Sequence, residues 1–212
     1  MKPFLFPPAP PGCVVVKVGG SLHDHPQLGP GLSEYLDTLD AKLILLVAGG
    51  GGVGDVVREW DNTHSLGDEA AHRFALIGLH LPTLLLLSLL GLDDVETAFT
   101  SDLEWWKDSG HGSRVIGLSS LFFLSRFEAK IGRVPHSWEL TTDSIAAYAA
   151  ATARCPLVLL KSTEIPPGMG WDEAAARGYV DSHFPTVVEA HGLNVTPVNF
   201  RCWLDDAGSG DR

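Results

Sequence analysis

The chain has 212 residues, enough for one sizeable hydrophobic core, and we expect a single domain over residues 1–212. Its formal net charge is −11, which argues against the basic face of a nucleic-acid-binding protein. Hydrophobic residues make up 45% and charged residues 19%, an ordinary balance for a globular protein. Three cysteines without metal-ligand spacing fit a reducing compartment, and we expect a cytoplasmic protein.

The two ends of the chain differ in composition from the middle. Residues 1–12 include five prolines and lack the basic and apolar regions of a signal peptide, so they predict an extended arm. Residues 205–212 are polar and contain glycine, which predicts a flexible tail.

Between these ends, short apolar runs alternate with segments of helical periodicity. Runs typical of buried strands cover 13–18, 43–48, 95–97, 114–118, 157–160 and 194–200. Helical segments cover 28–39, 53–61, 68–81 and 143–153, and 105–112 is typical of a loop. This alternation predicts an α/β fold, a three-layer αβα sandwich with a mostly parallel central sheet.

One apolar segment, 74–92, is nearly long enough to cross a bilayer. It contains His80, Pro82, Thr83 and Ser88, which favour a helix buried in a core or in a subunit contact. We therefore expect no membrane partner, and we expect a homo-oligomer.

The strand predicted over 13–18 carries a lysine and ends at a glycine turn. Lys17 is followed by Gly19, Gly20 and Ser21, so a positive charge and exposed backbone N–H groups meet at one strand end. Glycine lets the backbone approach an anion closely, because no side chain stands in the way. The pattern predicts a phosphate-binding turn. The alternative is a solvated lysine followed by an ordinary turn.

Four adjacent glycines, Gly49, Gly50, Gly51 and Gly52, separate the next strand from the next helix. A helix N-terminus binds anions through its free N–H groups and its dipole. No Lys-Ser/Thr pair follows these glycines, so they do not form a Walker loop. We predict an anion-binding turn here, with a plain flexible loop as the alternative.

Two further segments carry a carboxylate and a second lysine. Thr142 and Asp143 begin an alanine-rich helix, and one of them is expected to cap it. Such a carboxylate at the carboxyl edge of a sheet can also hold a lysine in place. Lys161 follows the next strand and precedes Ser162 and Thr163, and its alternative is a solvated loop position.

These segments occur in the order found in the amino acid kinase superfamily, which the chain resembles over most of its length. The resemblance is carried by 16–21, 49–52, 140–147 and 157–161. Within that superfamily the chain resembles the kinases of methanofuran biosynthesis, which convert (5-(aminomethyl)furan-3-yl)methyl phosphate to its diphosphate. This narrower resemblance is carried by 51–61, 68–72 and 135–138.

The resemblance implies roles for the predicted site residues. In the superfamily the first lysine and its glycines contact the transferred phosphoryl group, and the aspartate orients the catalytic lysines. The catalytic residues implied are Lys17, Asp143 and Lys161. The nucleotide-binding positions implied are Gly19, Gly20, Ser21, Lys161, Ser162 and Thr163. The resemblance places the second glycine turn beside the acceptor, and the predicted acceptor-binding positions are Gly49, Gly50, Gly51, Gly52, Asp55, Arg58 and Thr142. Of these, Arg58 is a candidate partner for a phosphate and Asp55 for an amine, and the alternative for both is a plain surface position on a helix.

The chain departs from the superfamily pattern at two places. The strand over 157–160 is followed by Lys-Ser-Thr-Glu-Ile-Pro, where many relatives have a Thr-Asp-Val-Asp-Gly-like nucleotide loop. The region 178–190 contains no lysine, although acetylglutamate kinases carry one after the nucleotide loop. We therefore expect Lys161 to supply the second positive charge of the site.

The predicted activity is transfer of the γ-phosphoryl group of ATP, with Mg²⁺, to a small anionic acceptor such as a phosphate monoester. Trp105, Trp106 and Trp138 are candidate walls for a flat acceptor ring, with packing as the alternative. His72 and His136 are expected to be core or capping residues. Two alternatives stay open. One is a non-catalytic nucleotide- or anion-binding storage protein on the same fold, and the other is a UMP kinase-like enzyme.

Overall fold

The computed structural model describes residues 9, 11–92, 99–100 and 114–208. Within these residues six strands form one sheet in the order β3-β4-β2-β1-β5-β6, and every neighbouring pair is parallel. The strands are β1 (Cys13–Val18), β2 (Leu43–Ala48), β3 (Phe99–Thr100), β4 (Val115–Leu118), β5 (Leu157–Lys161) and β6 (Val195–Asn199). The parallel sheet predicted from the apolar runs is therefore confirmed.

The central strands form unbroken apolar runs because helices cover both of their faces. Every residue of β1 and β2 is buried. Successive side chains point to opposite faces, so Val14 and Val16 belong to one core cluster while Val15 belongs to the other. Lys17 shares the face of Val15, and it is the only charged residue in these two strands.

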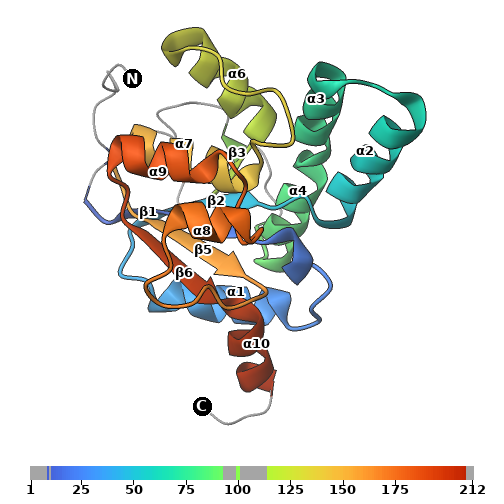
Figure 1. Cartoon of the computed structure of the whole chain (residues 1–212). Coiled ribbons are helices and arrows are strands. Elements are labelled where there is room, and N and C mark those ends of the chain that lie inside the picture. Colours follow the sequence, from blue (N-terminus) through green and yellow to red (C-terminus); the bar gives the residue numbers. More distant parts are fainter. Residues whose placement is uncertain (1–8, 10, 93–98, 101–113, 209–212) are drawn as a thin grey trace.

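Helices cover both faces of the sheet, so the fold is a three-layer αβα sandwich (Figure 1). One face carries α3 (Asp68–Gly78), α6 (Ser120–Ile131), α7 (Thr142–Ala153) and α9 (Phe184–His191). The other carries α1 (Leu28–Thr38), α4 (His80–Leu89) and α10 (Phe200–Gly208). The remaining described elements are the 3₁₀ turn η1 (Gly20–Leu22), α2 (Gly51–His64) and α8 (Trp171–Ala176).

Several elements differ from the sequence-based predictions. Helix α2 begins at Gly51, so the last two glycines of 49–52 are helical and do not belong to a turn. Helix α10 reaches Gly208, so the first part of the segment predicted as a flexible tail is helical. Helices α6, α8 and α9 lie in segments for which we predicted no element. Strand 95–97, loop 105–112, the tail end 209–212 and most of the arm 1–12 lie outside the described residues.

The apolar segment 74–92 is divided between α3 and α4. Pro82, in the first turn of α4, has no N–H to donate to the carbonyl of Gly78, and the helix is interrupted at the residue between the two helices. By length and composition alone, Asp68–Leu89 could cross a membrane. However, Thr83 and Leu87 are buried and pack against Gly117 of β4. Helix α4 is therefore a core helix of the sandwich.

The sheet topology brings the segments after β1 and β5 together. From β1 the chain crosses one face through α1 to β2, whereas from β5 it crosses the other face through α8 and α9 to β6. Open parallel sheets bind ligands at the carboxyl edge where neighbouring strands lead in opposite directions. The backbone N–H of Gly19 donates to the carbonyl of Leu160 at 2.8 Å, which fixes the two segments side by side at this edge.

Candidate active site

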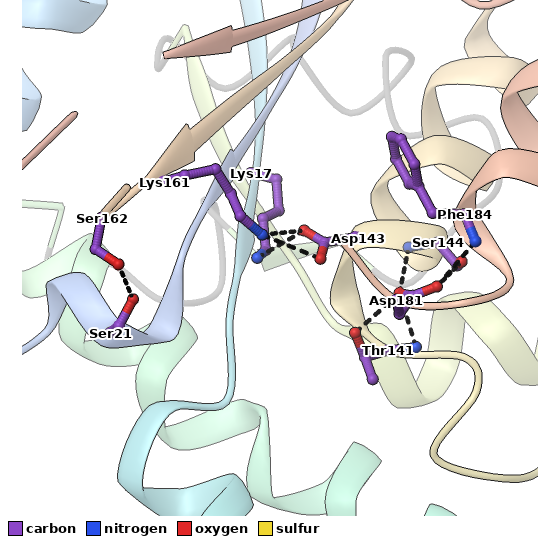
Figure 2. A network of polar contacts seen from close by, with 9 residues as sticks. All are labelled: Lys17, Ser21, Thr141, Asp143, Ser144, Lys161, Ser162, Asp181 and Phe184. Carbon is purple, nitrogen blue, oxygen red and sulfur yellow. Dashed lines mark hydrogen bonds and ion pairs between the residues drawn. The ribbon is translucent and has the colours of Figure 1, made fainter. Parts of the chain in front are cut away.

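Two lysines from neighbouring strands meet one carboxylate at the carboxyl edge of the sheet (Figure 2). Nζ of Lys17 lies 2.8 Å from Oδ1 of Asp143. Nζ of Lys161 lies 3.2 Å from Oδ1 and 3.1 Å from Oδ2 of the same carboxylate. Lys17 pairs with Leu159 in the sheet, so Lys161, two residues later, points to the same face. Asp143 reaches this face from the first turn of α7.

Burial of this cluster changes the pKa values of its charged groups. Lys17 and Asp143 are only 4% and 5% exposed. Burial raises the pKa of Asp143, but the ammonium groups of Lys17 and Lys161 outweigh it and hold the pKa below its ordinary value. Burial, followed by repulsion from Lys17, lowers the pKa of Lys161 to about 8 despite the attraction of Asp143.

The cluster therefore carries more positive than negative charge when all three groups are ionised. Two ammonium groups share one carboxylate, which leaves an excess of one positive charge in a site largely removed from water. A buried charge is unfavourable unless it is paired. An anionic ligand that brings the missing negative charge is the natural partner of such a cluster.

The glycine turns after β1 and β2 are in direct backbone contact. A Cβ on Gly20 would lie 2.1 Å from the backbone nitrogen of Gly51, and a Cβ on Gly49 would lie 2.3 Å from that of Gly20. Gly51 also has a φ of +52°, in the left-handed region that favours glycine. The close packing of the two turns thus requires these glycines, and it leaves bare backbone beside Lys17.

Gly52 is different, because a Cβ there would meet no atom within 4 Å. It lies in the first turn of α2, which has no acidic residue and receives no side-chain cap from Gly50. The first N–H groups of a helix have no partner within the helix, so an uncapped N-terminus offers them to an anion.

A hydrogen bond joins the first turn to the segment after β5. Oγ of Ser21 lies 2.7 Å from Oγ of Ser162 (Figure 2). Arg201 donates to the backbone carbonyl of Ser21 and, at 2.6 Å, to Asp24. Thr163, also predicted to bind nucleotide, is exposed. The structure therefore brings Ser21 and Ser162 together and leaves Thr163 on the surface.

A cavity of about 140 Å³ opens beside Lys17. Its walls come from the two glycine turns, from α2 and α3, and from the segment that leads into α7. Of the residues predicted to bind acceptor, those that line it are Gly49, Gly50, Gly51, Arg58 and Thr142. Gly52 and Asp55 line a second, more open hollow on the other side of α2, together with Ser21, Arg58 and Arg201.

The far wall of the cavity carries an arginine on an aromatic ring. The guanidinium of Arg58 lies 4.5 Å from the ring centroid of Trp138 and 2.9 Å from Oδ1 of Asp55. Trp138 Nε1 donates to Asp61 at 3.4 Å, and Asp61 also accepts from the backbone of Gly67. These contacts hold Trp138 against the cavity, and they place a cation between the two hollows.

Two stacked histidines lie behind the cavity. The rings of His72 and His136 are 4.6 Å apart and nearly parallel. Partial burial lowers the pKa of His136, but hydrogen bonds to Glu69 and Glu128 outweigh it and raise the pKa. Burial lowers the pKa of His72, whose Nε2 has no hydrogen-bond partner among the described residues. His72 is buried and lines the cavity, whereas His136 lies in an ion-pair network with Glu69 and Glu128, so the expected core or capping role of these residues stays a prediction.

Sequence reasoning missed Asp181, which lies far along the chain from the residues that it contacts. Its carboxylate accepts hydrogen bonds from Thr141 and Ser144, the residues that flank the first turn of α7, and from the backbone of Phe184 (Figure 2). No local pattern around Asp181 predicts these contacts. The signal that the sequence did offer is the pair of hydroxyl side chains near Asp143, Thr141 and Ser144, which require hydrogen-bond partners when they are buried.

The described part of the chain offers no ready-made metal cage. No group of three or more histidine, cysteine, aspartate or glutamate side chains is arranged as metal ligands within it. The carboxylate of Asp143 is already engaged by two ammonium groups. Mg²⁺ commonly binds through substrate phosphates. These residues therefore do not fit a Mg²⁺ site of their own.

The parallel αβα sandwich is an amino acid kinase-like fold, as its structural match to a uridylate kinase shows. The chain is 25% identical over 199 residues, 88% of each chain, to [5-(aminomethyl)furan-3-yl]methyl phosphate kinase from Methanocaldococcus jannaschii. It superimposes with a TM-score of 0.61 on uridylate kinase from Archaeoglobus fulgidus, at 12% identity, over 92% of this chain and 95% of that one. No family model matches the chain. The resemblance to the amino acid kinase superfamily is confirmed, and the findings support a phosphotransferase.

Proposed function

We propose that this protein is an ATP-dependent kinase that transfers the γ-phosphoryl group to a small phosphate monoester. The observation that carries the proposal is the pairing of Lys17 and Lys161 with the single carboxylate of Asp143, beside two turns of bare backbone. Phosphoryl transfer requires in-line positioning and positive charge around the transferred group. A buried cluster with excess positive charge meets the second requirement.

Each member of the cluster has a distinct role in this proposal. Lys17 neutralises charge on the transferred phosphoryl group, because it lines the cavity between the glycine turns. Lys161, the last residue of β5, supplies positive charge on the nucleotide side. Asp143 holds both ammonium groups in place and takes no proton. An acceptor phosphate is already an ionised nucleophile, so the reaction needs no general base.

The cavity beside Lys17 favours a small acceptor that carries, besides the phosphate that is phosphorylated, another anionic group or a planar ring. Its volume of about 140 Å³ is below that of most drug-sized ligand pockets, which favours a small acceptor. Arg58 can bind a phosphate at its far wall, and Trp138 can face a planar ring. We propose (5-(aminomethyl)furan-3-yl)methyl phosphate as the acceptor, because the curated relative bears the name of that activity.

The experiment is a panel assay in which the purified protein is incubated with Mg-ATP and one candidate acceptor at a time. ADP release is the measured quantity. The panel contains the furan phosphate, UMP, an acyl amino acid and a buffer blank. We expect ADP release with the furan phosphate well above the blank. Turnover of UMP alone would favour the uridylate kinase alternative. Nucleotide binding without turnover of any acceptor would favour a storage protein and contradict a kinase.

We also propose that the chain forms a homo-oligomer through the outer face of α2, α3 and α4. Several large apolar side chains are at least 40% exposed on these helices, namely Trp60, Ile77, Leu81 and Leu85. Contiguous exposed apolar side chains commonly mark protein interfaces. Sedimentation velocity should give a mass above the 22.7 kDa of one chain, whereas a monomer at micromolar concentration would contradict this assembly.

A further inference from the structure

We propose that Asp181 is a positioning residue for the transfer, and that it fixes the first turn of α7 so that Asp143 keeps both lysines paired. Its kinetic consequence rests on the proposed function, whereas its effect on Lys161 does not. Asp181 does not touch either lysine in the described contacts. It acts through the backbone and the hydroxyl groups on either side of Asp143.

The contacts of Asp181 enclose the first turn of α7. Its Oδ2 accepts from the backbone N–H of Thr141 at 3.0 Å, from the Thr141 hydroxyl at 2.8 Å and from the N–H of Ser144 at 3.0 Å. Its Oδ1 accepts from the Ser144 hydroxyl and, at 3.0 Å, from the N–H of Phe184. One carboxylate thus joins the start of α7 to the start of α9 (Figure 2).

This arrangement replaces the usual helix cap. A threonine at the N-cap normally accepts a hydrogen bond from the third residue of the helix through its own hydroxyl. Thr141 occupies the N-cap of α7 but makes no such bond, and its hydroxyl donates to Asp181 instead. Asp181 accepts the N–H of Ser144 in its place. A carboxylate at this end also complements the helix dipole.

The clamped turn carries the one carboxylate that the two lysines share. Asp143 lies between Thr141 and Ser144, so a shift of that turn moves its side chain away from the ammonium groups. The charged groups facing Lys161 are Asp143 from α7 and Lys17 from β1. If Asp143 withdraws, the repulsion from Lys17 and the burial remain, and the pKa of Lys161 falls below its value of about 8.

The first test measures the titration of Lys161 without any kinase assay. The full-length protein is acetylated with trace acetic anhydride over a pH series, and the peptide that contains Lys161 is quantified by mass spectrometry. Asp181→Ala should lower the midpoint by about one pH unit, the size of shift expected when a neighbouring opposite charge is lost. Asp181→Asn, which keeps one oxygen for α7, should lower it less. An unchanged midpoint in Asp181→Ala would overturn the inference.

A matched control separates positioning from general loss of stability. Thr152→Ala removes a buried hydrogen bond to the carbonyl of Tyr148, near the far end of the same helix. It should lower the thermal midpoint but leave the titration of Lys161 unchanged. If Thr152→Ala moves that titration as much as Asp181→Ala does, the effect is one of stability and the inference fails. Should Asp181→Ala not fold, Asp181→Asn carries the same comparison.

The second test is kinetic and distinguishes this inference from the proposed function. In the assay with the furan phosphate, Asp181→Ala should lower kcat by about 10-fold or more while the KM for ATP changes less. Equal kcat in Asp181→Ala and wild type would overturn the positioning role while the kinase stands. If wild type turns over no acceptor, the proposed function fails, and the titration of Lys161 alone decides the inference.

Discussion

A charged residue inside a buried strand is the most consequential single position in this chain. Lys17 lies in the middle strands of the sheet, where its ammonium group can be tolerated only beside a counter-charge. The sequence made this position visible, because a lysine interrupts an otherwise apolar run. The identity of the counter-charge was less visible, since Asp143 is more than a hundred residues away and also resembles an ordinary helix cap.

Replacing Lys17 tests the charge assigned to the transferred group. Lys17→Ala should lower kcat by about 10²–10³, the usual cost of removing one charge aimed at a transition state. The measurement is steady-state ADP release with the furan phosphate. Lys42→Ala, an exposed lysine before β2, is the matched control and should retain full turnover. Turnover of Lys17→Ala within a factor of two of wild type would contradict the assigned role.

The titration of Lys161 predicts the alkaline limb of the pH profile. Its pKa is lowered to about 8, so the ammonium form predominates below that pH and is lost above it. Transfer that needs the charge should therefore decline as pH rises through about 8. In Lys161→Arg the charge persists, because a guanidinium does not titrate in this range, and the weaker activity should stay level. A wild-type rate that stays level to pH 10 would exclude this group.

Some helices and strands could be predicted from the sequence and others could not. Strands β1 and β2 were predicted with their observed bounds, because unbroken runs of β-branched and leucine residues are typical of buried parallel strands. The predicted start of α2 was wrong, because glycine is a poor helix former and Gly51 is held by contact with Gly20, in the turn after β1. Helix α10 was missed because tertiary contacts with α1 outweigh its polar, glycine-containing end.

Gly20, in the turn after β1, and Gly52, in the first turn of α2, should respond oppositely to the same substitution. Gly20→Ala forces a Cβ to within 2.1 Å of the Gly51 backbone, so it should displace the turns and lower both stability and kcat. Gly52→Ala meets no atom and replaces glycine in a helix, so it should raise the free energy of unfolding by up to about 1 kcal/mol.

The stabilised variant then reports on ligand binding. Gly52 lines the more open hollow, where a methyl group would meet a phosphate that approaches the N-terminus of α2. Because Gly52 is one of the predicted acceptor-binding positions, Gly52→Ala should raise the KM for the furan phosphate several-fold although the protein is more stable. Chemical denaturation and initial rates on the same preparation measure both quantities. An unchanged KM would show that no phosphate approaches this residue.

At the scale of the whole molecule, the site depends on strand order, which no local pattern reveals. The lysines become neighbours because β5 returns to pair with β1 after β2 and β4 have been added on the other side. Strands β1, β2, β4, β5 and β6 were predicted from their own composition, whereas β3 was not, and the pairing of distant segments follows from packing of the whole sheet. The resemblance to a known superfamily, rather than the residues themselves, made the convergence of the four motifs predictable.

The excess charge at that convergence should make the unliganded protein less stable than it could be. The pKa of Lys161 is about 8 in the folded protein, against 10.5 for an ordinary lysine in solvent. Unfolding therefore favours the charged form of Lys161. At neutral pH, keeping this lysine charged in the folded protein lowers the free energy of unfolding by at most roughly 3 kcal/mol. Lys161→Met, which fills similar volume without charge, should raise the free energy of unfolding while it lowers activity.

The pH dependence and a ligand distinguish this effect from better packing. The stability of wild type should rise relative to Lys161→Met between about pH 8 and 10.5, because the folded protein releases this proton before the unfolded chain does. Inorganic phosphate at pH 7 should narrow the gap in thermal midpoint, since an anion that binds the cluster stabilises only wild type. If the stability difference between wild type and Lys161→Met did not change with pH or with phosphate, the charge of Lys161 would not destabilise the folded protein.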